Sequence, residues 1–205
     1  MLIYDLEIIR SPKFDPKRPN YKYALGWQDY VGMGIACIGW YDYQTGKSGC
    51  NKMDWMEGPD IADIEENKRL FDMFTSADLV IGYNNHKFDD PMMRAHGIAI
   101  SEFKSYDILT NIYAAVGLSG SWDYKTHGGF SLGAVCEANG IEGKSGNGAD
   151  APFDWQDGKY EEVMNYCLHD VNPMTKGLVD KIFCDGGLIN PKTKKFVRMA
   201  IPWME

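Results

Sequence analysis

The chain has 205 residues, a hydrophobic content of 44% and a formal net charge of −8. This length and apolar content can bury a sizeable core, and the length favours one domain, residues 1–205, over two. No apolar run approaches a membrane span, and Asp5 and Glu7 stand where a signal peptide needs an apolar stretch. We therefore expect a cytoplasmic protein with no membrane partner, and the net charge argues at first sight against a nucleic-acid enzyme.

Hydrophobic patterning predicts alternating strands and helices. In chain order, these are a buried strand at residues 1–9, an irregular proline-rich loop at 11–20, a hairpin at 35–55, a helix at 61–74, a strand at 79–83, a helix at 91–96, a short strand at 105–108, a helix at 109–116 and a long helix from residue 160. Pro173 should kink or restart the last helix, and Gly186 and Gly187 should end it.

The cysteines are odd in number and widely spaced along the chain. There are five of them, with no Cys-x-x-Cys pair: Cys37, Cys50, Cys136, Cys167 and Cys184. Such a pattern is typical of reduced thiols in a cytoplasm and argues against a structural zinc site.

Two acidic residues interrupt the first predicted strand. Asp5 and Glu7 are separated by one residue, and successive side chains of a strand point to opposite faces, so the two acids share one face about 7 Å apart. A carboxylate that is buried without partners is costly. The pair is therefore the strongest single indication of an active site in this sequence.

Three further residues extend this pair. Asp89 follows the strand at 79–83, near the carboxyl end where open α/β sheets bind ligands, and Tyr166 and Asp170 share one face of the last helix because they are four residues apart. Singly, Asp89 could be a turn former or helix cap, Tyr166 a packed ring and Asp170 a solvated acid. Together, four converging carboxylates predict a site for two divalent ions, Mg or Mn, whose phosphoryl-transfer chemistry is typical of nucleases.

Three ordered segments resemble the motifs of the DEDD group of 3′–5′ exonucleases. The first is Asp5-Leu6-Glu7, the second is Gly82-Tyr83-Asn84 followed by Phe88-Asp89-Asp90-Pro91, and the third runs from Tyr166 to Val171. The second segment is similar to that of the proofreading domains of family-B DNA polymerases. The residues from Phe130 through Gly143-Lys144-Ser145-Gly146 to Trp155 are similar to those of stand-alone exonucleases of bacteria and phages.

The third motif distinguishes two subtypes. Members with a catalytic histidine place it five residues before the last aspartate, where this chain has Asn165, and the tyrosine subtype places tyrosine four residues before it, which is Tyr166. The resemblance therefore implies the tyrosine subtype. His169, next to Asp170, is expected to face elsewhere on the helix, in packing or at the surface.

The resemblance covers roughly residues 1–180 and implies an α/β fold, a ribonuclease-H-like mixed sheet flanked by helices. It implies that Asp5, Glu7 and Asp170 hold the metal that activates water. Asp5 would bridge to the second metal, which Asp89 supports directly or through water, and Tyr166 would orient the attacking water. Asn84 and Phe88 are expected at the rim of the site, with the core as the favoured alternative for Phe88.

Basic residues are unevenly distributed. Five of them stand against one acid in the loop after the first strand, namely Arg10, Lys13, Lys17, Arg18 and Lys22 against Asp15, and a C-terminal group adds Lys192, Lys194, Lys195 and Arg198. Long-range attraction could bring phosphates to these residues, and we expect Lys13, Lys17 and Arg18 to contact the substrate. A merely solvated basic loop is the alternative.

The expected activity is metal-dependent hydrolysis of nucleic acid from a 3′ end, in a bacterial or phage-infected cell. Single-stranded DNA is the first expectation for the substrate, and RNA is the second. Two other functions stay open: a nucleic-acid-binding or scaffold protein of the same fold without turnover, and a structure-specific endonuclease.

Overall fold

The computed structural model describes residues 1–56, 65, 67–98, 100, 104–118, 122–143, 146 and 148–200. Its elements are β1 (Leu2–Ile8), α1 (Tyr30–Met33), β2 (Ile35–Asp42), β3 (Lys47–Trp55), α3 (Lys68–Ser76), β4 (Val80–Gly82), α4 (Asp89–Ala95), β5 (Ser105–Asp107), α5 (Ile108–Ala115), α6 (Tyr124–His127), α7 (Leu132–Ala138), α8 (Ala151–Gln156), α9 (Tyr160–His169), η2 (Asp170–Thr175), α10 (Lys176–Asp185), β6 (Gly187–Ile189) and β7 (Phe196–Arg198). The start of the helix predicted at 61–74, and Lys144 and Ser145 of the exonuclease-like stretch, lie outside the described residues.

The fold is a mixed α/β arrangement around a five-stranded sheet of order β3-β2-β1-β4-β5. β1 runs antiparallel to β2 and parallel to β4, β2 and β3 form the predicted hairpin, and β5 is parallel to β4. β1 pairs with β4 only at Leu2 and Ile3, where the partners are Val80 and Ile81. The later residues of β1 therefore extend past the end of β4, and their backbone on that side is open to other partners.

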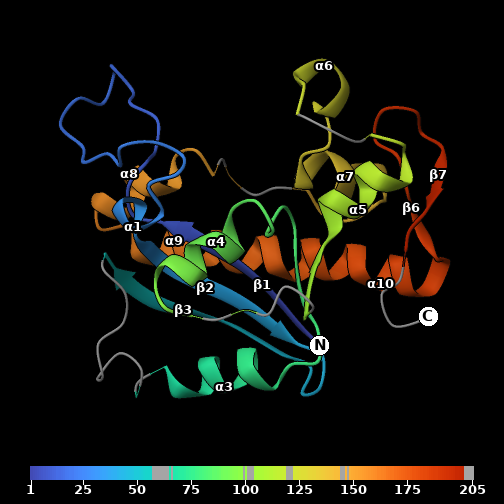
Figure 1. Cartoon of the computed structure of the whole chain (residues 1–205), viewed down its shortest axis with the longest axis horizontal. Helices are drawn as coiled ribbons and strands as arrows, with labels where there is room; N and C mark the ends of the chain where they lie inside the picture. The colour runs from blue at the N-terminus through green and yellow to red at the C-terminus, as the bar shows by residue number, and fades with distance from the viewer. Residues whose placement is uncertain are drawn as a thin grey trace.

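The two faces of β1 bury different sets of side chains. Leu2, Tyr4, Leu6 and Ile8 pack with buried residues of α3 and α4, as the alternation in the sequence predicts. Ile3 and Ile9 pack in other clusters, with residues of η2, α10, α8 and α9. In Figure 1, α9 and α10 run in line along the far side of the sheet, and α4 lies in front of it.

The last long helix is interrupted where Pro173 predicts it. α9 ends at His169, Asn172 has non-helical dihedrals of φ −142° and ψ 110°, and α10 restarts at Lys176. α10 ends at Asp185 and is capped by Gly186, whose left-handed φ of 74° suits glycine, so the predicted stop is confirmed. Asp170 keeps helical dihedrals of φ −63° and ψ −31° at the C-cap of α9, so this acid lies at the end of the helix, two residues before the kink.

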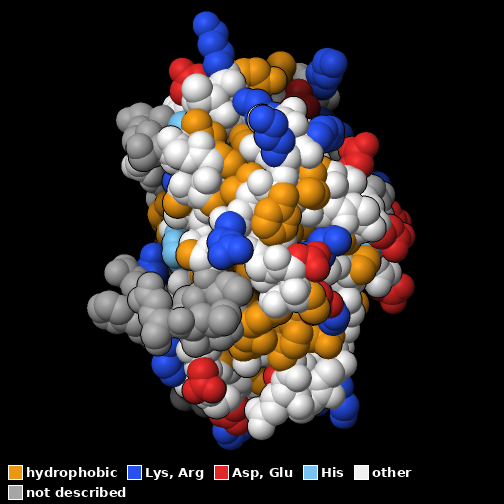
Figure 2. Space-filling view, turned by 90° about the vertical axis from the view of Figure 1, so that its right-hand side faces the viewer, with side chains coloured by type: hydrophobic (Ala, Val, Ile, Leu, Met, Phe, Trp, Pro, Cys, Tyr) orange, Lys and Arg blue, Asp and Glu red, His pale blue; other side chains and the backbone are white. Residues whose placement is uncertain are grey.

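The β6–β7 hairpin was not predicted, because each strand is only three residues long and shows no period. It carries the C-terminal basic group at one end of the molecule, and the residue 11–24 loop lies at the other end (Figure 1). On the face that Figure 2 shows, Lys and Arg side chains are scattered between hydrophobic and uncharged ones. The two basic segments therefore lie at opposite ends of the molecule (Figure 1).

The helices that the structure describes all fall short of the length and apolar character that a membrane span requires.

Candidate active site

Asp5 and Glu7 lie on the face of β1 that α9 covers. They sit between Ile3 and Ile9 on that face, where Glu7 is buried and Asp5 is half-buried. Asp5 pairs with Gly39 of β2, and a Cβ built on Gly39 would lie 3.0 Å from the sulfur of Cys167. The missing side chain at Gly39 therefore lets α9 approach the sheet closely beside the two acids.

The approach of α9 brings Tyr166 and Asp170 to the same place. Burial raises the pKa of the Tyr166 hydroxyl, and the negative charges of Asp170, Glu7 and Asp5 raise it further, together with a hydrogen bond to Asp170. Three of the four predicted carboxylates thus act on one phenol. Tyr166 consequently stays protonated at neutral pH and can both donate and accept a hydrogen bond.

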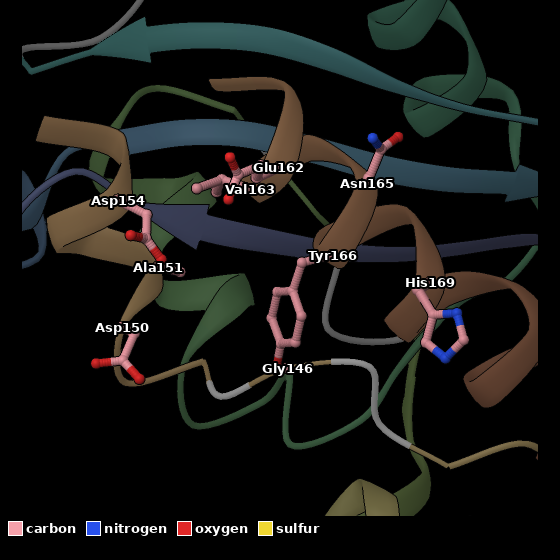
Figure 3. A pocket seen from close by; sticks show the side chains of 9 residues that line it. All are labelled: Gly146, Asp150, Ala151, Asp154, Glu162, Val163, Asn165, Tyr166 and His169. Carbon is pink, nitrogen blue, oxygen red and sulfur yellow. The ribbon is translucent and has the colours of Figure 1, made fainter. Parts of the chain in front are cut away.

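The Tyr166 ring is held in place by a glycine-containing loop. A Cβ built on Gly146 would lie 3.0 Å from the ring, and one built on Gly148 would lie 3.1 Å from the hydroxyl oxygen. Figure 3 shows Tyr166 extending from α9 toward Gly146. The loop can pass this close because neither glycine has a side chain, so its position limits that of the hydroxyl.

Asp89 reaches the site from the other side of β1. It is the first residue of α4, and its Oδ1 accepts a hydrogen bond from the backbone N–H of Leu6 at 3.2 Å. The carboxylate therefore lies against the peptide between Asp5 and Glu7. Burial, and then the charge of Asp90, raise the pKa of Asp89 to about 8, although the bond from Leu6 opposes the shift.

Two acids that sequence reasoning did not single out hold Asp89 and its loop. Asp90 accepts hydrogen bonds from Tyr4, from Asn85 Nδ2 at 3.1 Å and from Ser105 Oγ at 2.7 Å. Asp107, also buried, accepts from the backbone N–H of Asn84 at 2.9 Å and fixes this residue in a left-handed conformation with φ 68°. The sequence offered one signal for each of these acids. Asp90 directly follows the motif residue Asp89, and Asp107 stands at the end of a predicted strand.

Glu7 lines a groove of about 770 Å³. Lys13, Arg18, Asn84 and Phe88 all line it, so four of the five predicted substrate contacts lie together beside one of the predicted ligands. Lys17 is not among the lining residues. Its side chain is exposed, and its backbone N–H donates to Asp15 Oδ1 at 2.9 Å.

The groove is aromatic as well as basic. Besides Phe88, its walls carry Phe14, Trp27 and Phe153, and the side chains of Phe14 and Trp27 are 60% and 64% exposed. Phe88 packs partly on the core and lies edge-on to Trp27, with ring centroids 6.2 Å apart. Phe88 therefore belongs to both the rim and the core.

The charge of Arg18 is largely compensated within the groove. Its Nη2 lies 2.7 Å from Asp150 Oδ1, and its Nε lies 3.8 Å from Asp15 Oδ2. The guanidinium also lies 4.2 Å from the centroid of the Phe153 ring. Arg18 thus connects the residue 11–24 loop to the segment before α8. Lys13 also lines the groove, and among the described residues its ammonium group makes no salt bridge or aromatic contact of this kind.

A second cavity, of about 570 Å³, lies along α9 on the side of Tyr166 that Figure 3 shows. His169 lines it together with Tyr166, and its Nε2 lies 3.0 Å from the carbonyl oxygen of Gly143. His169 is therefore half-buried and packs against the segment at Gly143. The glutamate and aspartates that share this cavity are Asp150, Asp154 and Glu162.

The tightest set of metal-ligating atoms among the described residues consists of sulfurs. Those of Cys37, Cys50 and Cys167 all lie within 4.8 Å of one another, whereas the four acids do not form such a set. Hydrogen bonds from Cys167 and Cys37 lower the pKa of the Cys50 thiol, although its burial opposes them. The wide spacing in the sequence argued against a structural zinc site and did not predict this group, because strand pairing and helix packing join residues that are far apart in sequence.

No model of a known protein family matches the chain, and no curated protein matches its sequence.

Proposed function

We propose that this protein is a metal-dependent 3′–5′ exonuclease of ribonuclease-H-like fold that hydrolyses nucleic acid. The observation that carries the proposal is the position of the Tyr166 hydroxyl, on which the charges of Asp170, Glu7 and Asp5 act together. These residues come from two motifs more than 150 positions apart in the printed sequence. The strand order and directions of the sheet are compatible with the fold that the motifs imply.

The four acids suit two divalent ions, Mg or Mn. Asp5, Glu7, Asp89 and Asp170 offer hard carboxylate oxygens, which these ions prefer. The raised pKa of Asp89 supports this assignment, because a buried carboxylate beside other acids is stabilised when a cation compensates its charge. When bound, the two ions stabilise the charge on the attacking and leaving oxygens of a phosphoryl displacement.

Tyr166 would orient the attacking water. A phenol that stays protonated among three carboxylates can hold a water molecule by donating to it or accepting from it, without itself becoming a metal ligand. The loop at Gly146 and Gly148 would keep the hydroxyl at this place. The role of Tyr166 is thus positioning, and the acids carry the ions.

The groove would hold the end of a single strand. Its exposed Phe14 and Trp27 offer faces on which unpaired bases can stack, and Lys13 offers charge to the backbone. DNA is the first candidate. RNA is the second, because its bases can stack on the same aromatic side chains. Glu7 lines the groove, so a strand lying in it would come within reach of this acid.

The test is a product analysis with strands labelled at the 3′ or the 5′ end, as DNA and as RNA, in Mg²⁺ or Mn²⁺. The proposal predicts stepwise shortening from the 3′ end that Asp5→Asn abolishes and that the exposed-site control Asp72→Asn keeps. Internal cuts would indicate an endonuclease instead. Binding without products would indicate a scaffold protein.

A further inference from the structure

Three cysteines from three separate elements meet beneath the proposed active site. Cys37 lies on β2, Cys50 on β3 and Cys167 on α9, and the three sulfurs lie within 4.8 Å of one another. In the β2–β3 register, Cys37 pairs with Lys52 and Gly39 pairs with Cys50. Cys37 and Cys50 are therefore diagonal neighbours on one face of the hairpin, the face that α9 covers with Cys167.

The spacing of the sulfurs fits ligation of a single ion. Zn–S bonds of about 2.3 Å place the sulfurs of a trigonal site about 4 Å apart. The separations in the protein stay within 4.8 Å, so small side-chain adjustments suffice. Buried cysteines often serve only as small apolar residues. That role does not require three sulfurs from three elements to share one point.

The surroundings favour a soft cation. Met56 and Met164 pack against the same buried cluster as the three cysteines, so this part of the core also holds polarizable thioether sulfur. Lys52 lies two residues from Cys50 on the same strand, and its Nζ sits 3.7 Å from the centroid of the Tyr160 ring, at the first residue of α9. Cys37 and Cys167 are buried and Cys50 is half-buried, so an ion would enter past Cys50.

We propose that Cys37, Cys50 and Cys167 form a second metal site that takes one thiophilic d¹⁰ cation, of the Zn²⁺, Cd²⁺ or Cu⁺ type. Thiolate and thioether sulfur selects such ions, whereas carboxylate oxygen selects Mg²⁺ and Mn²⁺. The two sites therefore differ in the ions that they bind. Binding at the sulfurs releases protons, since thiolates are the ligands.

The sulfur site adjoins the proposed catalytic one. The Cys167 sulfur lies 3.5 Å from the backbone oxygen of Asp5 and 3.9 Å from its Oδ2. An ion that draws Cys167 toward Cys37 and Cys50 changes this contact.

The binding test uses Cd²⁺ with the reduced, metal-free full chain, in excess Mg²⁺ to occupy carboxylate oxygens. We expect one Cd²⁺ per chain and thiolate-to-metal charge-transfer absorbance in the ultraviolet. Cys37→Ser, Cys50→Ser and Cys167→Ser should each weaken binding by at least the roughly hundredfold that even outer-shell changes can cost. Cys136→Ser and Cys184→Ser, which alter thiols outside the group, should leave it unchanged.

X-ray absorption at the cadmium edge of the wild-type protein keeps the proposal testable if a serine variant fails to fold. Three sulfur neighbours are expected. A shell made only of oxygen, or equal loss of the absorbance in the Cys136→Ser and Cys184→Ser controls, would overturn the proposal. None of these readouts needs catalytic turnover, so a failure here is distinct from a failure of the exonuclease assignment.

Discussion

The Leu6 N–H donates to Asp89 Oδ1 at 3.2 Å, which joins the start of α4 to β1 between its two acids. The bond is possible because β1 continues beyond Ile3, its last residue paired with β4, so the N–H of Leu6 is not used by that strand. Asp89 is thereby fixed to the strand that carries Asp5 and Glu7, although it comes from another element.

The metal-free protein should lose stability as pH rises through the titration of Asp89. The folded-state pKa of about 8 lies above the ordinary carboxyl value of 3.8, so the folded state keeps a proton there that the unfolded state gives up. The free energy of unfolding should therefore fall between about pH 4, where the unfolded state loses the proton, and about pH 8, where the folded state loses it, and recover on acidification. Asp89→Asn should flatten this slope.

Denaturant unfolding in a chelator, at several pH values, measures the slope. Asp72→Asn is the matched control, because Asp72 is exposed on α3, where it pairs with Lys68. A slope in Asp89→Asn as steep as that of the wild type would mean that Asp89 does not titrate in this range.

Tyr166→Phe should lower turnover without removing the metals. Loss of a group that only positions water should cost about tenfold to a thousandfold, the range expected for lost orientation or proton-transfer help. Mn²⁺ affinity, measured by calorimetry, should barely change. A loss of affinity equal to that of Asp5→Asn would make Tyr166 a ligand.

Gly148→Ala should mimic part of that defect. The added Cβ would lie 3.1 Å from the Tyr166 hydroxyl oxygen, which must then move. In a double-mutant cycle, Gly148→Ala should cost less activity in the Tyr166→Phe background, because the hydroxyl is already absent. Gly143→Ala is the control in the same loop, since its Cβ meets nothing within 4 Å. Equal losses in both backgrounds would contradict this coupling.

The two lysines of the residue 11–24 loop should behave differently. Lys13→Ser should weaken binding of a single strand and reduce the slope of log affinity against log salt by about 0.7, the effect of one lost phosphate contact. Lys17→Ser should change both less, because Lys17 does not line the groove. Affinities measured over a range of salt decide this, and equal effects of the two variants would contradict a strand path along the groove.

The regular parts of the site were accessible from the sequence. Strand alternation places Asp5 and Glu7 on one face of β1, and helical spacing places Tyr166 near Asp170. Both periods are properties of local backbone geometry. The interruption at Pro173 follows equally from its missing N–H and its ring.

Contacts between distant segments were not accessible. Lys13 and Lys17 cannot be distinguished in the sequence of an aperiodic loop. Only the tertiary structure shows that Lys13 lines the groove and Lys17 does not. Arg18 meets Asp150 across 132 positions of sequence, and Cys167 meets Cys37 and Cys50 only because α9 packs over Gly39. Tertiary packing determines such contacts, and local sequence patterns do not predict how distant segments pack.

The most direct test of the exonuclease assignment is the rate at which the first nucleotide leaves the 3′ end of a labelled single strand. With Mn²⁺, the wild type should release it and continue stepwise, whereas Asp5→Asn and Asp170→Asn should release almost none, because each loses a ligand to the ions. Both variants should melt near the wild-type temperature in chelator. Release by either folded variant at the wild-type rate would contradict the account.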